Sequence, residues 1–173
     1  MNVQETRNKV KLGGVFEFRC FDKNGKLKWV DKAENLVVDN GLNFILDLLF
    51  AAEPGVDPWY VGLTDGTPTV ASGDTMSSHS GWTEVTAYSE AARQTFSGSR
   101  TGQSVDNDAS KASFSINADS TTIGGAFLTD ASTKGGTGGT LLCAAAFTGG
   151  DKSADSGDTL EVKYTFTAAD DGA

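Results

Sequence analysis

The chain has 173 residues, of which 38% are hydrophobic and 21% are charged, and its formal net charge is −9. A chain of this length buries roughly 70% of the surface of its unfolded form, so it can build a core without disulfides or a structural metal. Glycine, serine and threonine make up about a third of the residues, a composition that favours short strands and turns over long helices. These features exclude a small disulfide scaffold and predict one β-rich domain.

The apolar runs are too short to span a bilayer. The longest, residues 42–52, is interrupted by Asn43 and Asp47, and residues 1–12 are polar and charged. We therefore expect neither a membrane span nor a signal peptide. Synthesis is expected in the cytoplasm. Cys20 and Cys143 each lie in an apolar, strand-like run, so we interpret them as buried free thiols and not as a disulfide.

Charge is distributed unevenly along the chain. Residues 1–32 contain 8 Lys and Arg against 4 Asp and Glu, whereas residues 33–173 contain 6 against 19. The acidic remainder disfavours binding of the whole chain to nucleic acid. The basic segment has two interpretations: it docks on an acidic surface, or its lysines are solvated and protect the edge of a hairpin.

The N-terminal part is predicted to contain an arm and a hairpin. Residues 1–13 have few apolar side chains and are expected to form a flexible basic arm. The runs 15–21 and 26–30 are strand-like and flank residues 22–25, where the pair Asn24 and Gly25 supplies the positive φ of a tight turn. We therefore expect a first β-hairpin here.

One segment has the periodicity of a helix. Its apolar residues fall at i, i+3, i+4, i+7 and i+8, namely Leu42, Ile45, Leu46, Leu49 and Phe50. Asp39 or Asn40 can cap it, and the segment 54–58, with a proline at each end, stops it. We expect a helix over about residues 40–51 whose apolar face closes one end of the β core.

The rest of the chain reads as strands and loops. Strands are expected at 59–63, 94–100, 112–118, 122–129, 141–148 and 160–166. Residues 64–92 are expected to form a long loop carrying Trp82 and Tyr88, and residues 135–139 and 151–158 surface connections.

The predicted fold class is mainly β. Seven or more strands with one short amphipathic helix indicate an antiparallel β-sandwich or a jelly-roll-like barrel. We expect a single β domain over residues 14–169, followed by a C-terminal tail at 170–173.

No motif indicates catalysis, a cofactor or a metal. Residues 151–158 place oxygens like the start of a calcium loop, but Ser156 and Val162 stand where an EF-hand needs Gly and Glu. His79 is the only histidine, no serine lies in a Gly-x-Ser-x-Gly elbow, and the glycine run at 135–139 lacks the pattern of a phosphate loop. We therefore expect no catalytic residues, no cofactor and no metal site.

The acidic residues Glu84 and Glu90 are interleaved with Trp82 and Tyr88. Such a mixture is found in clefts that cleave or bind sugars. In the simpler interpretation, the two aromatic side chains fix the long loop to the core, and the carboxylates face water or pair with Arg93. An enzyme is therefore not expected, while a carbohydrate-binding module stays open as an alternative.

Several segments together resemble structural proteins of tailed-bacteriophage virions. Their order is Asn-Leu-Val, helix, Trp-Tyr-Val-Gly-Leu, Trp-x-Glu, Gly-Gly-Ala-Phe-Leu and a closing strand, and they cover roughly residues 15–168. The segments are 34–43, 59–65, 81–84 through Tyr88 and Arg93, 124–128 and 157–162. The resemblance implies a non-enzymatic protein that coats or is attached to a virion, without a residue-level site.

Within this resemblance, we expect a capsid decoration (cement) protein on the capsid surface, whose partner is the major capsid protein. Such a protein bridges neighbouring subunits in many copies, as a trimer or dimer, and needs neither nucleic acid nor a membrane. A basic arm suits docking on an acidic neighbour. The candidate capsid contacts are Arg7, Lys9, Lys11, Lys26 and Lys28. The alternative is a tail, baseplate or fibre component.

Overall fold

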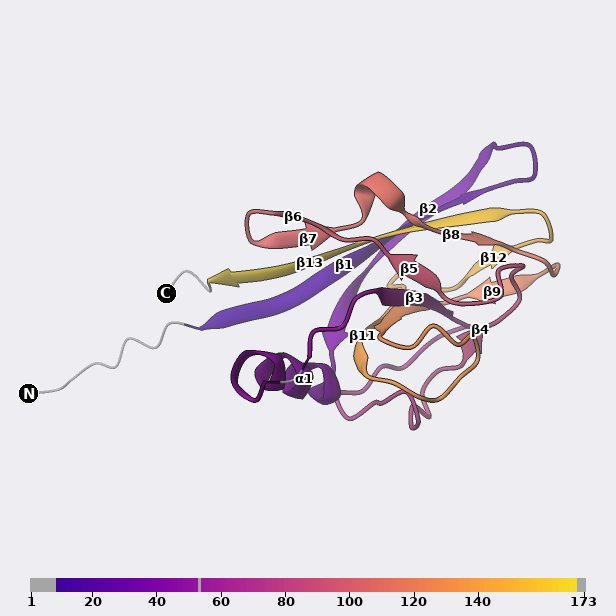
Figure 1. Cartoon of the computed structure of the whole chain (residues 1–173). Coiled ribbons are helices and arrows are strands. Elements are labelled where there is room, and N and C mark those ends of the chain that lie inside the picture. The colour runs from indigo at the N-terminus through magenta and orange to yellow at the C-terminus, as the bar shows by residue number, and fades with distance from the viewer. Residues whose placement is uncertain (1–8, 53, 171–173) are drawn as a thin grey trace, which may run out of the picture.

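The structure is a computed structural model that describes residues 9–52 and 54–170. Its elements are β1 (Val10–Phe21), β2 (Leu27–Val37), α1 (Asp39–Phe50), β3 (Trp59–Thr64), β4 (Glu84–Val85), β5 (Gln94–Phe96), β6 (Ser99–Thr101), β7 (Ser104–Asp106), a 3-10 turn (Asp108–Ser110), β8 (Ala112–Ser115), β9 (Thr121–Ile123), β10 (Gly125–Thr129), β11 (Leu141–Ala146), β12 (Lys152–Ala154) and β13 (Thr159–Asp170). The predicted mainly β, antiparallel fold with one helix is confirmed (Figure 1). No helix among the described residues is long and apolar enough to cross a membrane.

The predicted hairpin is present, and its strands are longer than expected. Its turn is closed by the Asp22 carboxylate, which accepts hydrogen bonds from the Asn24 and Lys26 amides, and by Gly25 at φ +77°. β1 pairs with β13 along its whole length, from Val10 to Phe21. Residues 10–13, predicted as part of a flexible arm, are therefore strand, and residues 1–8 lie outside the described residues.

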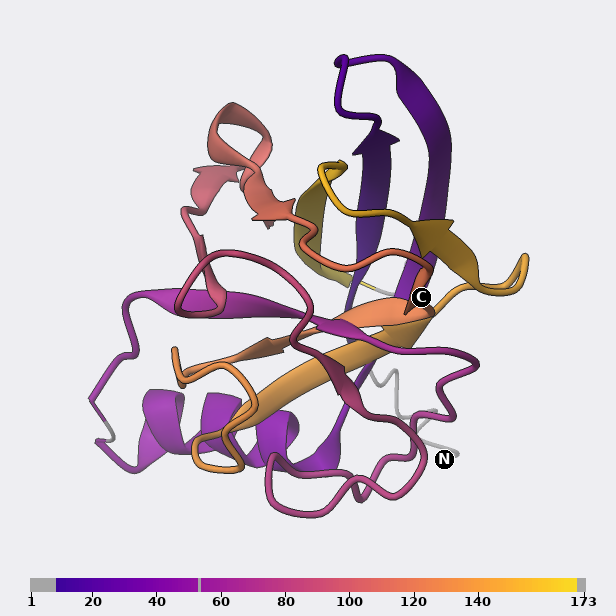
Figure 2. The same cartoon turned by 90° about the vertical axis from the view of Figure 1, so that its right-hand side faces the viewer.

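Eleven strands form a single sheet that bends at β2. The order is β4-β3-β10-β11-β2-β1-β13-β7-β6, with β5 added to β3 and β8 to β13, while β9 and β12 pair separately. The first part of β2 pairs with β1, and its last residues, 35–37, pair with β11. The change of partner along β2 allows the two halves of the sheet to face each other across the core, as Figures 1 and 2 show.

The main core lies between these two halves. Phe16 and Phe18 of β1 and Tyr164 of β13 pack against residues of the opposite half such as Leu63 and Leu128, and all five are at most 2% exposed. Phe16 and Tyr164 stack with ring centroids 4.2 Å apart. The period-2 alternation of β1 and β13 places their polar residues on the outer face.

β10 and β11 are buried on both faces, and the long loop explains why. On their outer side a second cluster forms from Phe127 and Leu141, with Met76 and Trp82 contributed by residues 64–92. The loop therefore covers this part of the sheet, and because both faces are buried the sequences of β10 and β11 are nearly continuous apolar runs. The prediction that Trp82 lies in a loop pinned to the core is confirmed.

Several strand boundaries differ from those expected. The strand predicted at 94–100 is divided into β5 and β6, and that at 122–129 into β9 and β10. At the second break Gly124 packs so closely on the Asp65 carbonyl that a Cβ would overlap it, and its amide donates to the Thr64 carbonyl. The short strands β7 and β12 were not predicted, because strands of three residues carry too little pattern.

α1 begins at Asp39, one residue before the predicted start, and the capping prediction is wrong. The N-cap is Val38, whose side chain has no acceptor for the free amides of the first turn. The Asn40 side chain instead accepts a hydrogen bond from the Leu141 amide. Gly41 lies against the Leu142 carbonyl, so closely that a Cβ would overlap it. The start of the helix is therefore held by β11.

The orientation predicted for α1 is also wrong. Of the five apolar residues expected to face the core, only Ile45 packs against it. The helix contacts the sheet through Gly41, Ile45 and Phe44, whose ring meets Trp59 edge-on at 5.4 Å. The remaining four are solvent-exposed: Leu42, Leu46, Leu49 and Phe50 are 38%, 55%, 65% and 84% exposed.

Candidate interaction surfaces

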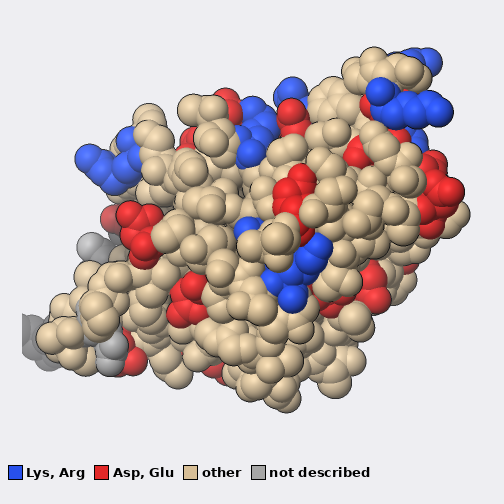
Figure 3. Space-filling model, turned by 45° about the vertical axis from the view of Figure 1, so that its right-hand side comes forward, with Lys and Arg blue, Asp and Glu red and all other residues tan. Residues whose placement is uncertain are grey.

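In the folded chain, the strands of the basic N-terminal segment lie beside strands of the acidic remainder. Antiparallel pairing sets Glu17 of β1 opposite Lys163 of β13, where the side chains form an ion pair at 3.4 Å. Asp31 of β2 pairs with Lys152 at 3.1 Å. In Figure 3 blue and red side chains accordingly interleave over the visible face. Both pairs use an acidic residue of the N-terminal segment, and among the described residues Lys28 is the one basic residue of that segment that forms an ion pair with the acidic remainder.

The predicted capsid contacts do not form one patch. Lys9 and Lys11 are exposed at the start of β1, and Lys26 is exposed in the hairpin turn at the other end of that strand. At about 3.3 Å per residue these ends are roughly 35 Å apart. Arg7 lies outside the described residues.

Lys28, the fifth candidate, is engaged within the chain. Its ammonium group donates to the Asp155 carboxylate at 3.0 Å and to the buried Asp158 carboxylate. These hydrogen bonds raise the pKa of Lys28 well above its ordinary value. Asp158 also accepts from the Asp155 amide. Lys28 therefore ties β2 to the loop before β13, a structural role that the sequence did not indicate.

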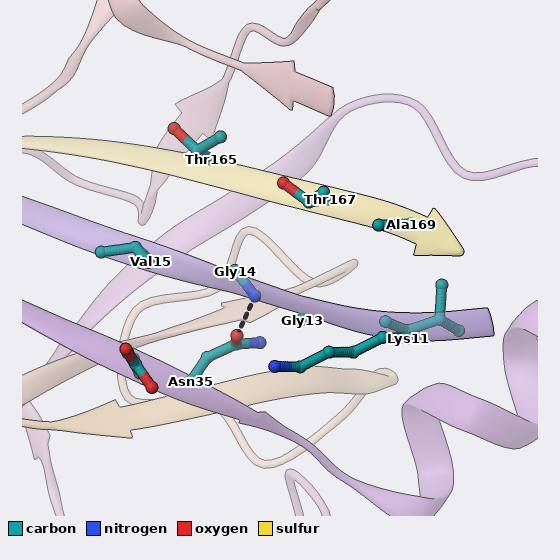
Figure 4. Close-up of a pocket in the computed structure, with 10 residues that line it drawn as sticks. Lys11, Gly13, Gly14, Val15, Asn35, Thr165, Thr167 and Ala169 are labelled. Carbon is teal, nitrogen blue, oxygen red and sulfur yellow. Dashed lines mark hydrogen bonds between the residues drawn. The ribbon is translucent and has the colours of Figure 1, made fainter. Parts of the chain in front are cut away.

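A groove of about 340 Å³ crosses β2, β1 and β13 near the start of β1 (Figure 4). Gly13, Val15, Thr165 and Thr167 are among the residues that line it. The Lys11 side chain runs from β1 toward β2 at its rim. The groove thus offers hydroxyl groups, the Lys11 ammonium group, the Glu34 carboxylate and a small apolar surface.

Beneath the groove lies a chain of hydrogen bonds. The Gly14 amide donates to the Asn35 side-chain carbonyl, and the Asn35 amide donates to the Tyr164 hydroxyl at 3.1 Å. The Cys143 thiol lies 3.3 Å from the same hydroxyl. A Cβ at position 14 would overlap Thr165 and Tyr164, so this close approach requires glycine. These contacts fix β1 to β2 and β13.

Trp82 is buried and hydrogen-bonded, so it is not a platform for a sugar ring. It is 5% exposed, and its indole NH donates to the Asp74 carboxylate at 3.0 Å. His79 stacks on it with centroids 3.8 Å apart and bonds the Trp82 carbonyl through Nδ1. The interpretation that Trp82 fixes the loop is therefore the correct one, and His79 is part of that contact.

Tyr88 is likewise in the core. It is 0% exposed, meets Phe114 edge-on at 5.0 Å, and lies under the Lys134 ammonium group at 4.3 Å. Burial raises the pKa of Tyr88 well above its ordinary value. Its hydroxyl has no hydrogen-bond partner among the described residues. Glu90, the neighbouring carboxylate, accepts a hydrogen bond from the Ser115 amide.

Arg93 and Glu84 form a buried pair, as one of the sequence interpretations expected. The Arg93 guanidinium donates two hydrogen bonds to Glu84, at 2.9 and 2.7 Å, and one each to the Ala131 and Gly136 carbonyls. Its side chain is fully buried, and that of Glu84 is 9% exposed. The Gly135 amide also donates to Glu84. The pair joins β4 to the loop at 130–136.

The two cysteines are free and buried, as predicted. Burial raises the pKa of Cys20 to about 11, assisted by the Asp158 charge, and burial also raises the pKa of Cys143 to about 11. Asp151, Asp155 and Asp158 bond to Thr67, Lys28 and backbone amides. Among the described residues no three His, Cys, Asp or Glu side chains converge as metal ligands.

The matching protein family is one of phage proteins. The family model described as "Podophage GP4 fiber I protein gp80" matches residues 39–167, from α1 to β13. The chain belongs to this family. It is therefore a structural protein of a bacteriophage virion, as the resemblance implied. A search of curated proteins and a search of solved structures each found no match.

Proposed function

We propose that this protein is a structural component of a phage fibre and acts by assembly, without catalysis. The observation that carries the proposal is the match to a fibre family over more than half of the chain, from α1 through nearly all of β13. The proposal therefore favours a fibre component, the alternative given above, over capsid decoration, which was the first expectation from the sequence.

The side-chain contacts support a structural role. The carboxylates that a sugar-cleaving site would use are engaged within the fold: Glu84 with Arg93, and Glu90 with the Ser115 amide. Trp82 and Tyr88, the aromatic candidates of a carbohydrate-binding module, are buried. By contrast, α1 exposes large apolar side chains, a feature that marks sites of protein association.

Capsid decoration, with the major capsid protein as partner, is the second candidate. It is favoured by the exposed lysines at both ends of β1: Lys9 and Lys11 at its start, and Lys23 and Lys26 in the turn after it. Such cations can dock on acidic surfaces of two neighbouring shell subunits. Their separation along the strand suits bridging better than a single contact.

The test is localisation of the polypeptide on purified particles by immunogold labelling and cryo-electron microscopy. Gold on fibres at the tail is the expected result. Gold spread evenly over the heads would replace the fibre proposal with decoration. Absence of the protein from particles that contain their full set of tail proteins would refute both. Particles from a phage lacking the gene serve as the labelling control.

A further inference from the structure

We propose that the exposed face of α1 is a self-association surface, on which α1 of a second copy of this chain packs. The surface consists of Leu42, Leu46, Leu49 and Phe50, which are 38% to 84% exposed, and we refer to it as the α1 stripe. The inference does not depend on the fibre proposal, because it concerns the purified chain alone.

The spacing within the α1 stripe is that of a seam between helices. Leu42, Leu46 and Leu49 recur at intervals of four and three residues, as in the a and d positions of a coiled coil. The opposite side of the helix, with Gly41, Phe44 and Ile45, is already used against the sheet. α1 therefore has two apolar faces, and the described part of the chain covers only one of them.

No other element among the described residues is suited to cover the α1 stripe. α1 is the only α-helix among the described residues, so a helical partner has to come from another molecule. Residues 1–8, which the structure does not describe, contain only Met1 and Val3 as apolar residues, too few to cover four large side chains. A second copy brings an identical stripe, and an isologous contact needs only such self-complementarity.

The area requirement indicates that the contact extends beyond the helix. At 1.5 Å per residue α1 is about 18 Å long and about 10 Å wide, and its face supplies less than the roughly 800 Å² per partner of a standard interface. Figures 1 and 4 show the start of β1 at the same end of the molecule as α1. There Val10 is 72% exposed, so it extends the apolar area.

Charge complementarity supports the same arrangement. α1 carries Asp39 and Asp47, both exposed, and no basic residue, whereas the start of β1 carries the exposed Lys9 and Lys11. No ion pair among the described residues involves any of these four. Lysines of one copy can therefore form a polar rim with the aspartates of the other, around an apolar centre.

The test is the mass of the purified chain by sedimentation equilibrium over about a hundredfold dilution series. The wild-type chain is expected to form oligomers, and Leu46→Glu and Leu49→Glu are expected to raise the dissociation constant at least about tenfold. The matched controls are Leu27→Glu and Val30→Glu, which also replace exposed apolar residues, 48% and 58% exposed, but on β2. Circular dichroism verifies that each variant is folded.

A second measurement does not rely on disruption. Leu49→Cys is expected to form a disulfide-linked dimer under mild oxidation, because cross-linking requires Cα atoms within about 7 Å. Val30→Cys is the control, and the native thiols are buried. A wild-type chain that stays monomeric throughout refutes the inference, as does an oligomer that the α1 and β2 variants weaken equally. If the purified chain is monomeric and the α1 variants are folded but no longer enter particles, the α1 stripe binds another virion protein instead.

Discussion

Replacing Arg93 tests whether the buried pair with Glu84 holds the long loop on the sheet. Arg93→Met removes four hydrogen bonds and leaves the Glu84 carboxylate, 9% exposed, with the Gly135 amide as its only remaining hydrogen-bond donor among the described residues. Breaking a buried ion pair on one side costs about 3–5 kcal/mol, because the other charge stays buried without compensation. In a chain of this size that loss lowers Tm by roughly 6–20 °C.

The double variant separates the ion pair from the backbone contacts. Glu84→Met alone leaves the Arg93 guanidinium buried without its carboxylate partner, and it is expected to lower the free energy of unfolding about as much as Arg93→Met. In the double variant both charges are gone, and three backbone groups lose their partners at about 1 kcal/mol each. The two single costs therefore do not add, and we expect a coupling energy of at least about 2 kcal/mol.

The assay is urea unfolding followed by circular dichroism. The midpoint should fall while the slope with urea stays constant, since a stability change leaves the exposed area of unfolding unaltered. Lys163→Met is the control, because its partner Glu17 is 52% exposed and such pairs contribute at most about 1 kcal/mol. Additive single costs, or an Arg93→Met cost as small as that of the control, would refute the reasoning.

Three further predictions concern single contacts. Gly41→Ala is expected to destabilise the fold by about 1–3 kcal/mol, because the new Cβ meets the Leu142 carbonyl. Helix propensity alone would instead favour Ala by about 1 kcal/mol, so a higher Tm of the variant in thermal unfolding would contradict this prediction. Between pH 9 and 11 the free energy of unfolding should fall by about 2–3 kcal/mol per thiol. The reason is that Cys20 and Cys143 ionise in the unfolded chain, while the folded thiols, with pKa about 11, stay largely protonated. A variant with alanine at both positions should lack this decline when its unfolding is measured against pH. Tyr88→Phe is expected to stabilise by up to about 1 kcal/mol, since the lost hydroxyl has no partner among the described residues; an unfolding cost in urea would contradict this.

The parts of the fold that were predictable carry their signal locally. Asn24 and Gly25 between two alternating runs sufficed for the hairpin, because the turn and the strand period are both read from neighbouring residues. The burial of both thiols followed from their apolar runs. The partner of β1 could not be predicted, since period 2 fixes the buried face of a strand but not which strand lies beside it. That partner is β13, at the other end of the chain.

The same limit applies to the interpretation of the charges. A basic segment followed by an acidic chain looks like a docking arm only if the two remain apart. Once β1 lies beside β13, Glu17 meets Lys163, and Lys28 meets Asp158 across more than a hundred residues. The candidate contacts that stay free are those at the ends of the hairpin, which could be identified only from the pairing register.

α1 shows what periodicity can and cannot establish. Apolar residues at helical spacing report that a face is suited to burial, but the sequence does not say whether the covering surface belongs to the same molecule. Here Gly41 determines the answer: with no Cβ it lets the helix approach β11, and this turns Leu46 and Leu49 away from the core. An apolar stripe left exposed in this way favours association, so the misassigned face of α1 is the surface on which the assembly of this protein should be tested first.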